Sequence, residues 1–177
     1  MSLEELRYPI GRFQMPKSIT KELLLSWMTD IECFPQRLRK EVVGLTDAQL
    51  DTPYRQDGWT VRQVVHHCAD SHMNAFVRLK LTLTEDKPTI KPYVEARWAE
   101  LPDSKMPIEP SLIIVDGLHQ RWSVLLSNLS DKDLARTYIH PESGREVRLD
   151  ITMAIYAWHC NHHLAHITRL KERGWGV

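Results

Sequence analysis

Near its C-terminus the chain reads Trp158-His159-Cys160-Asn161-His162-His163-Leu164-Ala165-His166, and this stretch is the most informative about the fold. Residues three or four apart on an α-helix lie on one face, so His159, His163 and His166 point the same way. At about 100° per residue, the same face also holds Tyr156 and Leu170. A face that mixes imidazole and apolar side chains is expected where a helix turns toward the interior of a bundle. Two imidazoles four residues apart can also chelate one metal ion.

An earlier segment can supply the third ligand that a catalytic site usually needs beside an open coordination position. It reads Val65-His66-His67-Cys68-Ala69-Asp70-Ser71-His72. On a helical wheel His67 lies at the edge of the apolar stripe, in line with Ser71 and Asn74, whereas His72 lies near the centre of the stripe. His66 projects away from the stripe, and we expect it to be exposed. The helical pattern by itself leaves the choice between His67 and His72 open.

Structural roles compete with the metal hypothesis at each of these residues. A single buried histidine is more often a hydrogen-bonded core residue, and for His119 and His140 that role, or simple exposure, is the better prediction. Several buried and half-satisfied imidazoles in one core would be costly, which favours a metal for the paired set. Cys68 and Cys160 adjoin the proposed ligands, but their wheel positions point elsewhere, so packed free thiols are expected. With Cys33 they form an odd, widely spaced set, not a disulfide framework.

Hydrophobic periodicity and start signals predict an all-α domain with long helices over residues 20–42, 60–84, 111–129 and 150–173. Thr60 with Gln63 three residues later has the spacing of a capping box. Ser111 and Asp150 are the predicted caps of the last two helices. Pro35 falls inside the first helix, where it predicts a kink or a break.

The connections differ in kind. Residues 86–110 contain five prolines and cannot form one regular element, although a short helix over 94–101 fits. So long a connection is often functional, for example as a wall or lid over a site. Residues 137–140 and 146–149 flank a turn-rich segment and predict a β-hairpin. The pattern as a whole predicts a four-helix bundle with one long crossover and a small hairpin before the last helix.

A faint internal repeat supports this arrangement. The stretch over residues 45–50, which contains a capping box at Thr46 and Gln49, resembles the stretch over residues 129–134. Each precedes a short linker and then a histidine-bearing helix. The repeat would place the two histidine helices in equivalent positions.

Length and composition set outer limits. The 177 residues fit a single domain over 1–177, and nine histidines are the one compositional excess. Lys plus Arg and Asp plus Glu number 23 each, so no basic field indicates nucleic acid or an anionic membrane as a partner. No apolar run approaches the roughly 20 residues of a membrane span, and the N-terminus lacks a signal-peptide pattern. We therefore expect a cytoplasmic protein.

Two long motifs and two shorter ones closely resemble the YfiT branch of the DinB-like superfamily. They are Trp59–His72, Tyr156–Ile167, Arg7–Gly11 and Ala99–Ser104. The resemblance covers essentially the whole chain and implies a DinB-like four-helix bundle, usually a homodimer, with one nickel or zinc ion on three histidines. By motif position the metal ligands fall on His67, His159 and His163.

The resemblance also sorts the remaining histidines. It leaves His66, His162 and His166 as neighbours of the ligands or as groups that orient them. Cys160 stands where the family commonly has a small residue, a difference that does not touch the ligand set.

Three neutral imidazoles leave the ion its full double positive charge and an open position, which lowers the pKa of a bound water toward about 7. The resemblance implies a metal-dependent hydrolase that acts through this water on a small-molecule substrate. A metal-dependent S-transferase using a low-molecular-weight thiol such as bacillithiol is the alternative, because zinc also binds thiolate. A non-catalytic binding module is the third hypothesis, although structural zinc usually has four protein ligands. Asp70, Asn74, Arg78 and Tyr156 are candidates for contacts to the ligands or the substrate.

Overall fold

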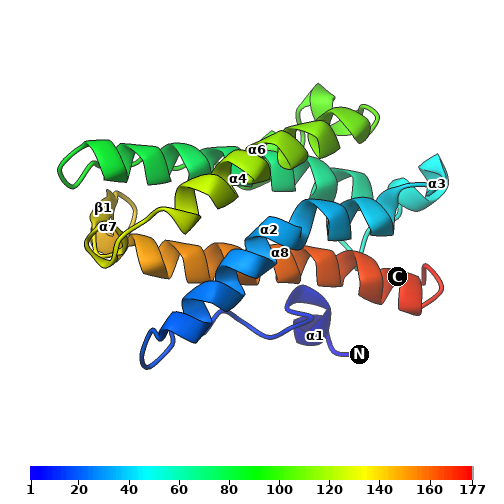
Figure 1. The fold of residues 1–177 in the computed structure, drawn as a ribbon. Coiled ribbons are helices and arrows are strands. Elements are labelled where there is room, and N and C mark those ends of the chain that lie inside the picture. The colour runs from blue at the N-terminus through cyan, green and yellow to red at the C-terminus, as the bar shows by residue number, and fades with distance from the viewer. Residues whose placement is uncertain (177) are drawn as a thin grey trace.

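Four long helices form the body of the computed structural model, which describes residues 1–176 (Figure 1). They are α2 (Lys21–Val42), α4 (Val61–Thr84), α6 (Glu109–Ser127) and α8 (Leu149–Glu172). Helix α2 packs on α6 and α8, and α4 packs on the same two helices. The predicted four-helix bundle is therefore confirmed.

The remaining elements of the described chain are short and lie at the ends of the long helices or between them. They are α1 (Leu3–Arg7), α3 (Asp47–Leu50), α5 (Glu95–Trp98), the 3-10 helix η1 (Pro102–Lys105), α7 (Asp131–Leu134), β1 (Thr137–His140) and β2 (Arg145–Arg148). The two strands pair antiparallel, with Thr137 opposite Arg148 and His140 opposite Arg145. The predicted hairpin before the last helix is confirmed, with its second strand one residue earlier than expected.

Helix α4 begins as its sequence predicts. The Thr60 hydroxyl accepts a hydrogen bond from the Gln63 amide, and the Gln63 side chain accepts one from the Thr60 amide. These bonds satisfy amides that have no partner inside the helix. At the first residues of this helix, local sequence decides the structure.

Two other predicted helix starts are wrong. Helix α6 begins at Glu109, two residues before Ser111, because a proline in the first turn gives up an amide that would have no helical partner anyway. Helix α8 begins at Leu149, and Asp150 lies inside its first turn, where it accepts hydrogen bonds from Arg148. In α2 the chain continues as one helix through Pro35, so the alternative of a break is excluded.

The internal repeat is visible in the fold. Helices α3 and α7 each begin with a capping box, formed by Thr46 with Gln49 and by Ser130 with Asp133. Each follows a long helix and precedes paired extended segments, which are the isolated Pro53–Thr60 bridge and the β1–β2 hairpin. The two histidine-bearing helices, α4 and α8, therefore occupy equivalent places in the two halves of the chain.

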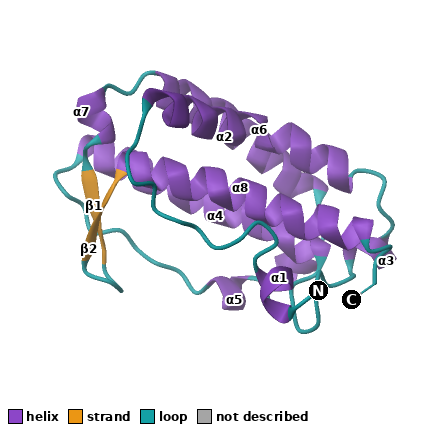
Figure 2. Cartoon of the chain, turned by 90° about the horizontal axis from the view of Figure 1, so that it is seen from below, coloured by secondary structure: helices purple, strands orange, loops and turns teal. Residues whose placement is uncertain are grey.

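The crossover from α4 to α6 runs along the bundle and carries α5 and η1 (Figure 2). Paired backbone bonds with Ile139 hold its start against the hairpin, and η1 packs on α4. It covers His66, whose Nε2 lies 3.1 Å from the Met106 carbonyl and whose Nδ1 lies 2.7 Å from the Ser111 hydroxyl. His66 is therefore buried, and its predicted exposure is wrong because helical periodicity does not register a covering loop.

The interior is a continuous apolar cluster drawn from all four long helices. Cys68 and Cys160 lie inside it as free thiols, as predicted, and burial raises the pKa of both. Across residues 1–176, none of the helices combines the length and the apolar character needed to span a bilayer.

Candidate metal centre

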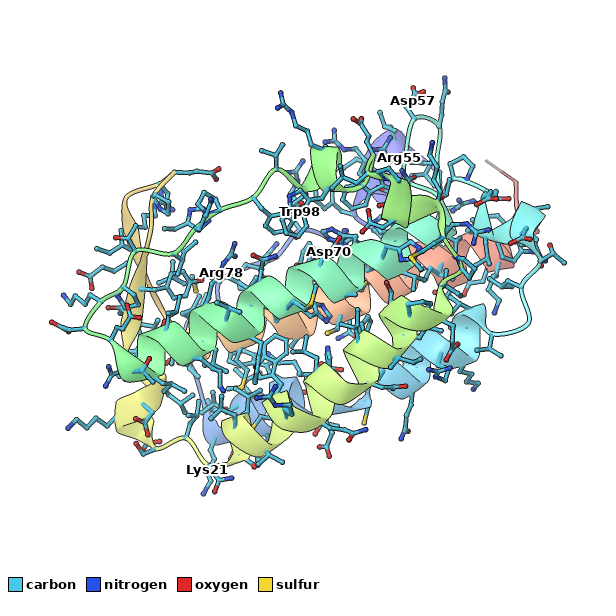
Figure 3. The ribbon with its side chains drawn as sticks, turned by 90° about the horizontal axis from the view of Figure 1, so that it is seen from above. Lys21, Arg55, Asp57, Asp70, Arg78 and Trp98 are labelled. Atoms are coloured by element: carbon cyan, nitrogen blue, oxygen red, sulfur yellow. The ribbon has the colours of Figure 1, made fainter. Side chains whose placement is uncertain are left out.

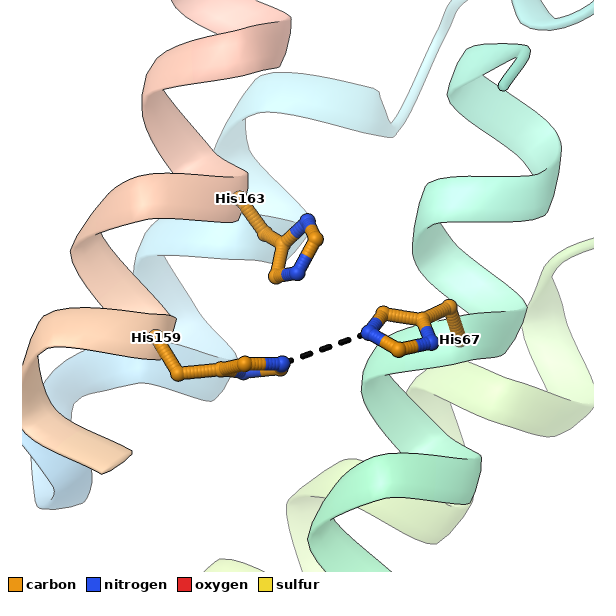
Figure 4. A group of neighbouring side chains, drawn as sticks. All are labelled: His67, His159 and His163. Atoms are coloured by element: carbon orange, nitrogen blue, oxygen red, sulfur yellow. Dashed lines mark hydrogen bonds between the residues drawn. The ribbon is translucent and has the colours of Figure 1, made fainter. Parts of the chain in front are cut away.

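His67 on α4 and His159 and His163 on α8 point toward one another between the two helices (Figure 4). One ring nitrogen from each lies within 4.8 Å of the other two. The Nε2 atoms of His67 and His159 are 3.2 Å apart. Tetrahedral zinc with bonds of 2.0–2.1 Å places two ligand nitrogens about 3.3 Å apart. The facing rings therefore fit a single ion with little rearrangement.

Burial keeps these three rings uncharged. His67 and His163 are buried, and His159 is half-buried. Desolvation lowers the pKa of His67 to about 4 and the pKa of His159 and His163 well below the ordinary value, and the neighbouring imidazoles lower all three further. Each ring is neutral at pH 7 and has a lone pair available. The Nδ1 of His163 is buried without a hydrogen-bond partner among residues 1–176. Buried polar atoms normally have a partner, so this unpaired nitrogen fits a ring that binds something besides the protein.

One wall of the centre is aromatic and another is polar. The Trp59 ring lies 4.6 Å from the His67 ring and is stacked 6.5 Å from His163, centre to centre. On the other side the Ser71 hydroxyl lies 3.4 Å from Nε2 of His159. Tyr156, buried behind Ser71, donates its hydroxyl hydrogen to the Ser71 carbonyl at 3.3 Å. Helical spacing puts Ser71 in line with His67, but the sequence does not single it out as a site residue, because a serine in a polar strip carries no distinguishing signal.

A second set of buried histidines continues from His159 away from the centre. His72 Nε2 lies 3.0 Å from Nδ1 of His159, and His72 Nδ1 lies 2.7 Å from Nε2 of His119. His119 Nδ1 lies 2.6 Å from the carbonyl oxygen of Ile31. His72 is buried, as its place near the centre of the apolar stripe predicted, and His119 takes the first of the two roles predicted for it, a hydrogen-bonded core residue and not an exposed one.

Three histidines within five residues of α8 form another close group, composed of His162, His163 and His166. The Nε2 atoms of His162 and His166 are 3.0 Å apart, and the His166 ring stacks on Tyr54 with 3.8 Å between ring centres. The group shares His163 with the first centre. His162 and His166 therefore lie beside the proposed ligands, on the side that α1 and the residues just after it cover. The Tyr8 ring lies 5.9 Å from that of His162, and a cavity of about 200 Å³ between Leu6, Pro9 and Tyr54 borders His166.

The other residues that the sequence offered for contacts to the ligands or the substrate differ in their surroundings. Asp70 and Arg78 lie along the side of α4 that the crossover follows (Figure 3). Burial, and then the nearby Asp103, raise the pKa of Asp70 to about 6, which leaves a carboxyl able to change charge near neutral pH. Arg78 and Asn74 donate to the backbone carbonyls of Lys91 and Asp70, so both have structural partners. Among these candidates Asp70 is the one whose carboxyl pKa is raised. Tyr156 is connected to the centre through Ser71.

Known proteins resemble this chain both in sequence and in structure. The DinB superfamily model matches residues 31–167. A protein of Bacillus cereus (strain B4264) and one of Bacillus mycoides (strain KBAB4), each named "putative metal-dependent hydrolase", are 54% identical over 171 residues, covering 97% of this chain and 98% of theirs. Among solved structures, YfiT from Bacillus subtilis superposes with a TM-score of 0.93 at 46% identity, over 98% of this chain and 99% of that one. YfiT is described as a probable metal-dependent hydrolase with an unusual four-helix bundle topology.

Proposed function

The chain belongs to the DinB superfamily, and on that premise we propose that it is a metal-dependent hydrolase whose ion is held by His67, His159 and His163. The observation that carries the proposal is the convergence of three neutral imidazoles from two helices, two of them with facing nitrogens 3.2 Å apart. Imidazole nitrogen suits both zinc and nickel, so either is a candidate ion. When bound, such an ion supplies Lewis acidity and activates water at neutral pH.

The surrounding residues suit this chemistry. Neutral ligands leave the positive charge of the ion uncompensated, because none of the three histidines contributes a negative charge. Trp59 packs against the His67 ring, with 4.6 Å between ring centres, and gives that side of the centre an apolar wall. Ser71, held by Tyr156 and 3.4 Å from His159, presents a hydroxyl that can bind a polar group of a small-molecule substrate. Asp70 is our candidate for moving a proton during the reaction, since its pKa is raised to about 6.

The test separates hydrolysis from its alternatives. Protein stripped of metal is loaded with one equivalent of zinc or nickel and assayed with activated esters and amides, and separately with a small thiol plus an electrophile. We expect metal-dependent ester or amide hydrolysis that His163→Ala abolishes and that His140→Ala, in the distant hairpin, retains. Turnover that requires the thiol would show that the protein is an S-transferase and not a hydrolase. Tight metal binding without turnover in either assay would favour a binding module.

Two smaller proposals accompany this function. We propose a homodimer and a small-molecule substrate, for which the resemblance to the family is the support. Light scattering during size-exclusion chromatography tests the first. A mass equal to a single chain of 20.7 kDa would contradict it.

A further inference from the structure

A proline in the middle of a long helix needs an explanation. Pro35 lies inside α2 and is buried, where a proline is strongly disfavoured. Proline has no amide hydrogen, so the carbonyl four residues earlier, that of Ile31, loses its helical partner. The Ile31 carbonyl is the one that accepts the hydrogen from Nδ1 of His119, at 2.6 Å. Pro35 therefore frees an acceptor inside the bundle, and His119 uses it.

This carbonyl sets the direction of a series of hydrogen bonds. An oxygen acceptor requires the hydrogen of His119 to be on Nδ1, so a neutral His119 has a lone pair on Nε2. His72 must then donate from Nδ1 across the 2.7 Å contact, which leaves a lone pair on its own Nε2. His159 must donate from Nδ1 across the 3.0 Å contact. The nitrogen left without a hydrogen is Nε2 of His159, the atom that faces His67 in the proposed metal centre.

The surroundings of His72 and His119 preserve this direction of hydrogen bonding. His72 is 0% exposed and His119 is 1% exposed, so bulk water does not compete for their hydrogen bonds. The Phe34 ring lies 5.1 Å from His72 and 5.5 Å from His119, and Trp122 lies 6.0 Å and 5.5 Å from the same two rings. Both ring nitrogens of His72 contact only imidazole nitrogens, so no anion is present beside that ring to balance a second hydrogen. Neutral rings carry one hydrogen each, and one hydrogen per contact is what the series requires.

We propose that Pro35, His119 and His72 are positioning residues that hold His159 in the tautomer with its hydrogen on Nδ1, so that Nε2 is ready to bind the metal. The inference rests on the proposed metal site and adds the device that prepares it. A histidine that binds a metal through one ring nitrogen commonly donates the hydrogen on the other to a carbonyl or carboxylate. Here two intervening imidazoles transmit the same orientation from a carbonyl on α2 to a ligand on α8.

Nuclear magnetic resonance on the metal-free protein reads the tautomer directly. With nitrogen-15 labelled histidine, two-bond proton–nitrogen correlations show which ring nitrogen carries the hydrogen, and the His159 signals are identified by their loss in His159→Gln. We expect the hydrogen of His159 on Nδ1. A hydrogen on Nε2 in the parent protein would overturn the proposal.

Substitutions test whether the effect begins at Ile31. In His119→Phe, His72 has lost its acceptor and can turn its hydrogen toward His159, which places a hydrogen on Nε2 of His159. Zinc affinity, measured by competition with a fluorescent chelator, should fall about 10- to 100-fold. In Pro35→Ala the new amide competes for the Ile31 carbonyl, so a smaller loss in the same direction is expected. Trp122→Phe is the matched control, since it alters packing against both rings without removing a hydrogen bond of the series.

The outcomes are distinguishable. Unchanged tautomer and zinc affinity in both His119→Phe and Pro35→Ala would overturn the proposal, as would an equal affinity loss in Trp122→Phe. Should His119→Phe fail to fold, the parent spectrum and Pro35→Ala still decide. A parent protein that binds no zinc would refute the proposed function, while its metal-free spectrum would still test the hydrogen-bond series.

Discussion

Acidification of the metal-free protein should unfold it above the pH range of about 4 in which unperturbed carboxylates titrate. Burial lowers the pKa of His67, His119 and His162 to about 4 and that of His166 to about 3, against 6.5 for an unperturbed histidine. The unfolded chain therefore binds protons that the folded chain does not. The stability contributed by these groups is fully present above pH 6.5 and is lost as the pH falls toward 4.

The magnitude follows from linkage. Each pKa unit is worth about 1.4 kcal/mol, so each of the four histidines removes about 2 kcal/mol between pH 7 and pH 5. Their sum, about 8 kcal/mol, is comparable with the whole stability of a typical domain, about 5–15 kcal/mol. We expect the metal-free protein to unfold between pH 6 and pH 4.5.

Urea unfolding followed by circular dichroism, in the presence of a chelator at several pH values from 7 to 5, measures this loss. His166→Phe is the informative variant, because phenylalanine can keep the stacking on Tyr54 while it removes one titrating ring. Its stability should depend on pH less steeply, by about 1 kcal/mol per pH unit. A stability that stays flat from pH 7 to pH 5, or an unchanged slope in the variant, would refute the reasoning.

Three further outcomes are expected. Zinc at 100 times its dissociation constant should stabilise the protein by about 2.7 kcal/mol in thermal unfolding, and His163→Ala should lose that increment. Leu38→Ala, at a site that is 0% exposed, should reduce the free energy of unfolding by about 2–5 kcal/mol in urea titrations; a loss below 1 kcal/mol would mean that the core there is loosely packed. Thr60→Ala should lose about 1 kcal/mol in the same assay by removing the cap of α4, and Thr60→Ser should retain most of it.

Much of the fold was predictable because its signals are local. The capping boxes at Thr46 and Thr60 begin α3 and α4 as predicted, since each involves residues only three positions apart. The predicted caps at Ser111 and Asp150 were wrong because both residues lie inside the first turn of their helices, where Ser111 contacts His66 and Asp150 binds Arg148 and the Ile151 amide. Ser111 contacts His66, a residue 45 positions away, and no local pattern carries that information.

The metal centre also has one part that local sequence predicts and one part that it does not. Sequence alone determined that His159 and His163 share one face of a helix, because a four-residue spacing fixes that geometry wherever the helix lies. Helical periodicity could not choose between His67 and His72, and only the resemblance to a family motif favoured His67. In the structure the two residues contact opposite nitrogens of the His159 ring: His67 faces Nε2 and His72 faces Nδ1. Periodicity states which residues share a face, whereas the rotation and height of one helix against another depend on packing throughout the bundle. Physical reasoning from the sequence therefore stops at the shared face, and the tertiary structure decides that His67 lies on the Nε2 side of His159 and His72 on its Nδ1 side.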